Sequence, residues 1–320
     1  MIRLTWLQFR AQAVTAAAAL AAVVVVLAVS APHRALDAGA SRWLYMAGIV
    51  VLYLTPAIIG IFWGAPLISR ELETGTFRLA WTQSISRTRW LAAKLGLTAL
   101  ASMVTAGLLS LLVTWWSSPM DQRNPLGGYR LPALLSGARD LAPIGSAAFA
   151  VALGVTIGLL ARRVVPAIAI TLAIVTAVQV AVPLWVRPHL ISPVRTVSPL
   201  NLSAISAVGS SFPGNSLGVG ATVNIPGAWV YSSQVTTTGG STSLGPAPHA
   251  CTSRSTKVLP ADQTNACNAA LGRLHLRQVV IYQPASRYWA FQWSETAIYL
   301  ALALLLTGFC TWWTSRRLSR

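Results

Sequence analysis

Charged residues are scarce in this sequence, and their scarcity excludes most kinds of soluble protein. They make up 10% of the 320 residues, against 54% hydrophobic residues, and the mean hydropathy is +0.60. Soluble domains carry about 25% charged residues, so this chain cannot cover a water-facing surface of its size. Its apolar content is also too high for a disordered chain. The composition therefore predicts an all-α protein that crosses a membrane several times.

Acidic residues are the rarest charged group, with 7 Asp and Glu against 24 Lys and Arg. A basic protein can bind nucleic acid, but the basic residues then cluster on a polar surface. Here the arginines stand mostly at the ends of apolar runs. That pattern is typical of chains anchored against anionic lipid headgroups. We therefore expect membrane lipid, and no nucleic acid, among the partners.

The sequence also lacks the motifs of an enzyme or a metalloprotein. It has no G-x-x-x-x-G-K-[S/T] phosphate loop, and its two lysines are Lys94 and Lys257. The four histidines show no metal-ligand spacing, and the apolar runs lack pairs of titratable residues. We expect no catalytic residue, no metal and no cofactor in this chain.

Six charge-free stretches are apolar and reach roughly 20 residues or more, enough to span about 30 Å of hydrocarbon. The first could be read as a signal peptide, but its apolar run is longer than the usual one of about 7–15 residues. We interpret it as an uncleaved helix. The six stretches lie between Arg10 and Arg34, Arg42 and Arg70, Lys94 and Asp121, Asp140 and Arg162, Arg163 and Arg187, and Glu295 and Arg316.

Six spans place both termini on one side of the membrane. The short segments on that side hold half of the basic residues, and such dense positive charge marks the cytoplasmic face. We therefore predict a multi-pass plasma-membrane protein with both termini in the cytoplasm. Its expected parts are residues 1–186, with an amphipathic start, five spans and a cytoplasmic loop at 69–90; an extracellular domain at 187–289; and residues 290–320, with the sixth span and a tail.

The predicted extracellular domain is rich in Ser, Thr and Gly and has no sustained apolar run. Its pattern predicts a small mixed domain, with strands at 219–225, 229–235 and 276–282 and a helix from Asp262 to Leu271. Cys251 and Cys267 lie in it, and an oxidising exterior favours a disulfide between them. Two free thiols are the alternative.

The cytoplasmic loop at 69–90 is the most informative segment. Glu71 and Glu73 are its only acids, and Gly75 indicates the end of a short helix. The simplest interpretation is a solvated basic loop that obeys the positive-inside rule. It does not explain why paired acids, a glycine and apolar residues occur together in so short a loop.

Two further features concern the spans. Gly60 and Gly64, like Gly154 and Gly158, have the spacing of a weak helix-packing motif. Glu295 stands at the edge of the last span, where an ionisable group is costly. It is either a gate or substrate contact, or an interfacial residue that reaches water or pairs with Arg287.

The sequence of the loop resembles the corresponding loop in membrane subunits of ABC transporters of the type-two permease family. The resemblance is carried by Arg70-Glu71-x-Glu73-x-Gly75-Thr76, by Ile85-Ser86-Arg87 and by Lys94. The run Tyr288-Trp289 with Phe291-Gln292-Trp293-x-Glu295 is similar to a subgroup common in actinobacteria.

This resemblance implies a transport subunit, usually of an exporter. The loop would carry a coupling helix, with Arg70, Glu71, Glu73, Gly75, Thr76 and Arg87 in the coupling element. It would seat in a separate ATP-binding subunit, which would hold the ATP and Mg²⁺. Two such permeases, as a homodimer or a heterodimer, would form the translocation path. The alternatives are a membrane receptor or immunity protein without transport, or, with less support, a membrane-embedded enzyme.

Overall fold

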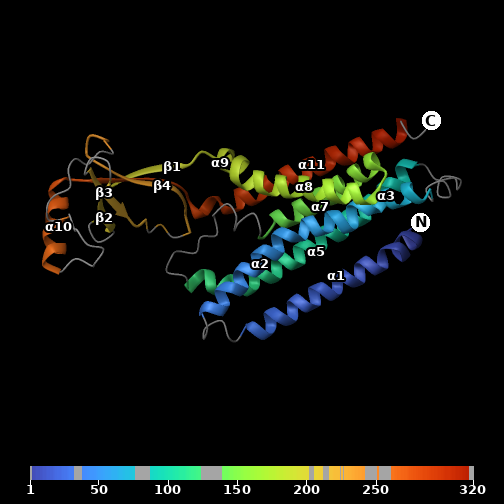
Figure 1. Cartoon of the computed structure of the whole chain (residues 1–320), viewed down its shortest axis with the longest axis horizontal. Coiled ribbons are helices and arrows are strands. Elements are labelled where there is room, and N and C mark those ends of the chain that lie inside the picture. Colours follow the sequence, from blue (N-terminus) through green and yellow to red (C-terminus); the bar gives the residue numbers. More distant parts are fainter. Residues whose placement is uncertain are drawn as a thin grey trace. The chain divides into compact units, whose positions relative to one another are not determined.

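The computed structural model divides the chain into two compact units. Among the described residues, the helical unit comprises those from 2 to 191 and from 288 to 316, and the strand unit comprises those from 192 to 287 (Figure 1). The structure describes residues 2–31, 38–75, 87–123, 139–201, 205–211, 216–223, 225, 227–241, 251 and 261–316.

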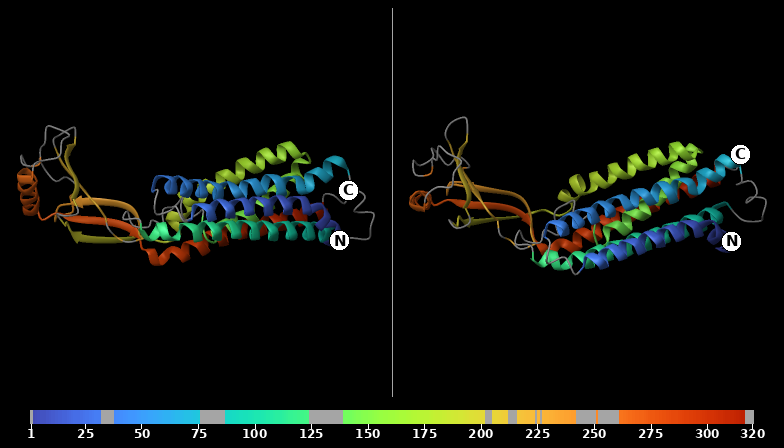
Figure 2. Two further views of the ribbon diagram at one scale, coloured as in Figure 1. Left: turned by 90° about the horizontal axis from the view of Figure 1, so that it is seen from below. Right: turned by 60° about the horizontal axis from the view of Figure 1, so that its bottom comes forward.

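The helical unit consists of long apolar helices, two of which continue through a short π-helical turn. The start of α1 and the end of α11 lie at the same end of this unit as α3 (Figure 1), and α1 runs beside α5 (Figure 2). The elements are α1 (Ile2–Ser30), α2 (Ala38–Ile59), η2 (Gly60–Gly64), α3 (Ala65–Thr74), α5 (Arg87–Arg123), α7 (Ala142–Ala161), α8 (Val164–Ala181), η3 (Val182–Val186), α9 (Arg187–Leu190) and α11 (Tyr288–Arg316).

Within the described residues, five helical stretches are long and apolar enough to cross a membrane. The helical, multi-pass character expected from the composition is thus supported. The first expected span falls in α1, whose apolar part Val14–Ser30 is shorter than those five, so the sixth span stays a prediction. The five stretches are Trp43–Thr74, Thr88–Ser118, Ala142–Ala161, Val164–Leu190 and Ala285–Arg316.

The two π-helical turns share a sequence feature, since each ends two residues before a proline. At the end of η2, the N–H of Ala65 donates to the carbonyl of Gly60, and Pro66 is the next residue. At the end of η3, the N–H of Arg187 donates to the carbonyl of Val182, and Pro188 is the next residue. A proline lacks the N–H of the α-helical ladder, and its ring clashes with the carbonyl four residues earlier. A wider preceding turn relieves that clash while the helix continues.

Helix α7 is the central helix of the unit, because most of its side chains are buried and α2, α3, α5, α8 and α11 all pack on it. Its glycines bring it against η2 and α3 at backbone distance. A Cβ atom on Gly154 would lie 2.6 Å from the amide nitrogen of Ala65 and 2.6 Å from the carbonyl oxygen of Gly60. The two glycine pairs noted in the sequence therefore pack against each other, and we call this contact the glycine seam.

The strand unit holds a three-stranded antiparallel sheet in the order β1-β5-β4 and a separate hairpin of β2 and β3. The strands expected at 229–235 and 276–282 are present as β4 and β5. The one expected at 219–225 ends early as β3, and β1 and β2 were not foreseen. The elements are β1 (Val194–Pro199), β2 (Ile205–Ser211), β3 (Ser216–Ala221), β4 (Trp229–Thr236), α10 (Ala261–Arg273) and β5 (Arg277–Gln283).

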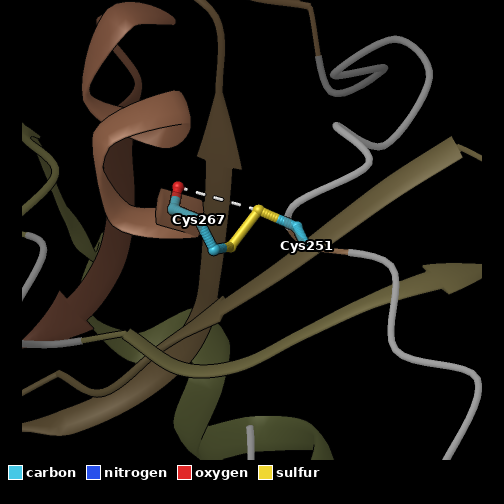
Figure 3. Close-up of a disulfide and its surroundings, with 2 residues drawn as sticks. All are labelled: Cys251 and Cys267. Atoms are coloured by element: carbon cyan, nitrogen blue, oxygen red, sulfur yellow. Dashed lines mark hydrogen bonds between the residues drawn. A yellow bond between two sulfur atoms is a disulfide. The ribbon is translucent and has the colours of Figure 1, made fainter. Parts of the chain in front are cut away.

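A disulfide joins Cys251 to Cys267, which lies on the expected helix α10 (Figure 3). Both cysteines are buried beside Leu271 and Leu276 in the core of the strand unit. In the chain-entropy description, a crosslink across a loop of this length stabilises a fold by about 3 kcal/mol. The bridge therefore compensates for the small apolar core of this unit.

The glycine seam gives a direct test of the packing. Gly154→Ala places a methyl group against backbone atoms of η2 and α3 that have no rotamer to yield. Overpacking of this kind costs about 1–3 kcal/mol, so we expect a lower midpoint of thermal unfolding in detergent. Gly96→Ala is the matched control, because a Cβ atom there meets nothing within 4 Å. Equal melting of the two variants would contradict the seam.

Candidate functional site

Helix α3 is short and amphipathic and begins the segment expected to couple to a partner. It starts with Pro66 in its first turn and ends at Gly75, whose φ of +72° lies in the left-handed region that favours glycine. Ser69 is buried and Leu72 packs on the main core, whereas Arg70 is exposed. The helix stop expected at Gly75 is therefore present.

Glu71 lies on the half-buried side of α3 and forms an ion pair with Lys94 near the start of α5. Lys94 is buried, and its ammonium group lies 4.8 Å from the ring centre of Trp90. A cation over an aromatic face gains further electrostatic stabilisation. The pair therefore joins the two helices on either side of the 76–86 segment, and Glu71 has its basic partner within this chain.

Glu73 contacts a different helix. Its Oε2 atom accepts a hydrogen bond of 3.1 Å from the backbone N–H of Val164, the first residue of α8. The first N–H groups of a helix lack internal partners, and a carboxylate there also meets the positive end of the helix dipole. Arg163, at the N-cap position, makes no such side-chain bond. Glu73 thus caps α8 from a neighbouring helix.

The structure does not describe the side chains of two residues of the expected coupling element. Thr76 lies outside the described residues, as do positions 77–86. Arg87 is the first residue of α5, and its side chain is not described. The described residues Arg70, Glu71, Glu73 and Gly75 lie together at the end of α3, and their role in coupling stays a prediction.

Glu295 lies at the other end of the unit and is buried, with a relative exposure of 1%. Its Oε1 atom is 3.3 Å from Nε of Arg187 on α9, which is as deeply buried, and the guanidinium carbon lies 4.9 Å from the ring centre of Phe291. The interpretation in which Glu295 reaches water or pairs with Arg287 is therefore wrong. Arg287 instead donates hydrogen bonds to the carbonyl of Ser192, at 2.7 Å, and to Oε1 of Gln283, at 2.8 Å.

The start of α11 carries further polar contacts on the same helix face. Gln292 accepts hydrogen bonds from the N–H groups of Leu141 and Ala142, at 3.2 and 3.1 Å, at the beginning of α7. Its amide nitrogen donates to the hydroxyl of Tyr288, which donates to a carboxylate oxygen of Asp140. These contacts attach α11 to the N-terminus of α7.

The alternation of buried and exposed residues explains the Tyr288–Glu295 run. The residues at positions 288, 291, 292 and 295 are buried, which is the spacing of one helix face. Trp289 and Trp293 are 56% and 63% exposed. Amphipathic rings of this kind are typical of a membrane–water interface.

Sequence reasoning did not identify Lys94 as the partner of Glu71 or Arg187 as the partner of Glu295. Lys94 offered a signal, because one of only two lysines in the chain stands beside a long apolar run. Arg187 likewise ends a charge-free stretch. Neither pattern names the opposing acid, because each pair joins helices far apart in sequence.

A comparison with known protein families matches residues 33–187 to the family described as ABC-2 membrane transporter related. The match supports an ABC-2-type permease. It covers just under half of the chain, from before α2 to the first residue of α9, and so includes Glu71, Lys94 and Arg187 but not Glu295. No curated protein and no solved structure matches the chain.

The buried ion pair gives a second prediction. Glu295→Ala leaves the Arg187 charge buried without its partner carboxylate, and removal of one member of a buried pair costs about 3–5 kcal/mol. We expect a clearly lower unfolding midpoint in lipid nanodiscs. The exchanged variant Arg187→Glu/Glu295→Arg should recover most of the loss.

Arg287→Ala is the control, because it removes the arginine that the sequence suggested as the partner. It should lower the midpoint much less than Glu295→Ala does. An equal loss in Arg287→Ala, or an exchanged variant no more stable than either single charge reversal, would contradict the Arg187–Glu295 pairing.

Proposed function

We propose that this chain is the permease subunit of an ATP-driven exporter and that it works with a separate ATP-binding subunit. The family match and the five apolar helical stretches support a permease. ATP and Mg²⁺ would bind in the partner, since this sequence has no phosphate loop. Export is the direction that the resemblance implies.

The observation that carries the proposal is the attachment of α3. Its two acids contact two different helices, Glu71 through Lys94 on α5 and Glu73 through Val164 on α8. The glycine seam holds its first turn against α7. A force applied to the segment after Gly75 would therefore reach three long helices at once. This is what a coupling element needs in order to convert nucleotide-driven closure of a partner into a rigid-body movement of helices.

The remaining parts of the proposal concern arrangement in the membrane. The chain would cross the plasma membrane six times, with α1 as the first span and both termini in the cytoplasm. The strand unit, with its disulfide, would be extracellular. A second permease, identical or different, would complete the translocation path.

Glu295 and Arg187 are candidates for a gate contact. Separating a buried ion pair is costly while its charges stay out of water, and the cost falls if water enters between the helices and hydrates them. The pair can therefore hold α9 to α11 in one state and release them in another. In the test below, charge reversal at either residue should lower coupled hydrolysis, and the exchanged variant should restore it.

The test is co-expression with an ATP-binding subunit followed by purification and assay of ATP hydrolysis. The chain alone should have no activity, and the complex should hydrolyse ATP. Glu71→Arg places two cations together and should lower coupled hydrolysis about tenfold or more, a change equivalent to about 1.4 kcal/mol. Glu71→Lys/Lys94→Glu should restore it, because the contact lies within the chain.

Hydrolysis by the isolated chain, lost on mutation of its own residues, would contradict the proposed division of labour. Full ATP hydrolysis by the complex with the Glu71→Arg variant would show that α3 does not take part in coupling. If the exchanged variant stays as inactive as Glu71→Arg, the acid has a direct partner on the ATP-binding subunit instead.

A further inference from the structure

The ends of α3, α5 and α7 expose arginines beside the acids that join these helices. Four are exposed, and the described part of the chain supplies no carboxylate within ion-pair distance of them. Glu71 is already paired with Lys94, and Glu73 with the N–H of Val164. We call the four residues the basic surface: Arg70, Arg89, Arg162 and Arg163.

The hydrogen bond from Val164 to Glu73 brings the α7–α8 turn into this surface. Arg162 and Arg163 form the whole of that turn and immediately precede Val164. The seam supports the same placement, because a Cβ atom on Gly158 would lie 2.7 Å from the carbonyl oxygen of Ala65. The turn therefore lies beside the last turn of α3, next to Gly75, where the 76–86 segment begins.

The backbone of Arg162 is consistent with a turn held in a fixed conformation. Its φ of +52° is in the left-handed region, which is unfavourable for a non-glycine residue, and its N–H bonds to the carbonyl of Gly158. Because this region favours glycine, arginine at this position presents a charge at a conformational cost.

We propose that the basic surface docks an acidic surface of the ATP-binding subunit, and that the α7–α8 turn is a second contact besides the 69–90 loop. This inference rests on the proposed function. The partner surface would be acidic, although the coupling element expected from the sequence includes the two acids Glu71 and Glu73. Both acids are engaged within the chain, and the charges left exposed are arginines, which favour bidentate contacts with carboxylates.

Position favours a protein partner over lipid headgroups. The arginines stand at both ends of the 76–86 segment, with Arg70 before it, Arg89 after it and the turn next to Glu73. A protein that contacts the last turn of α3, the first turn of α5 and the α7–α8 turn would meet all four arginines. Complementary charge would also speed and orient docking, and the association would weaken with salt.

The experiment measures binding of the ATP-binding subunit that co-purifies with the wild-type chain, titrated as a labelled protein onto full-length chain in nanodiscs. Arg162→Glu/Arg163→Glu is compared with Arg316→Glu, an exposed arginine at the end of α11 outside the basic surface. Each is measured at low and moderate salt, in discs of phosphatidylcholine alone and in discs with phosphatidylglycerol. Arg162→Lys/Arg163→Lys retains the charge and checks that the turn still folds.

We expect the double reversal to weaken binding at least tenfold in both kinds of disc, with a smaller salt dependence, and Arg316→Glu to stay within about twofold. The lysine variant keeps both charges but loses the bidentate geometry, so it should bind more tightly than the double reversal and less tightly than the wild type. Unchanged binding of the double reversal would overturn the inference. Loss confined to phosphatidylglycerol discs would also overturn it and assign the surface to lipid headgroups. If the wild-type chain recruits no ATP-binding subunit at all, the proposed function itself fails.

Discussion

The close approach of α7 to η2 and α3 is the constraint on which the rest of the helical unit depends. Lipid tails are as apolar as leucine, so helices in a membrane gain little from burial and associate through tight packing and polar contacts. The missing side chains of Gly60, Gly64, Gly154 and Gly158 permit this packing. Once α3 is held against α7, Glu71 and Glu73 lie within reach of α5 and α8.

The two ion pairs seen among the described residues of the helical unit have the same local context. Each involves a short helix that follows a π-helical turn: Glu71 on α3 after η2, and Arg187 on α9 after η3. A π-helical turn changes the direction in which the following residues face, and such turns are frequent at functional sites. Both turns precede a proline, so the sequence itself sets the orientation of each charged residue.

Part of this arrangement follows from the sequence. Apolar runs predict the long helices, because length and composition suffice for a membrane-spanning helix. The spacing of Gly60 with Gly64 and of Gly154 with Gly158 predicted helix packing, and Gly75 predicted the end of α3. Cys251 and Cys267 were expected to pair, and α10, β4 and β5 were expected near their observed bounds.

The remainder depends on contacts between segments far apart in the chain. Glu295 was compared with Arg287, its neighbour in sequence, whereas its partner Arg187 comes before all five strands β1 to β5. Glu71 and Glu73 were expected to face a partner protein, because the pairing with Lys94 and Val164 requires the packing of α3, α5 and α8. Strands β1 and β2 lack strong alternation and were missed for that reason.

The central claim is that α3 moves as one body with the start of α8. Spin labels can be attached at the exposed positions Thr74, Val165 and Ser315. Pulsed electron–electron double resonance then measures the distances between pairs of labels in the complex with the ATP-binding subunit. The account predicts that the 74–165 distance stays constant between nucleotide-free and ATP-bound states while the 74–315 distance changes. A shift of the 74–165 distance on ATP binding would show that α3 moves independently of α8 and would contradict the account.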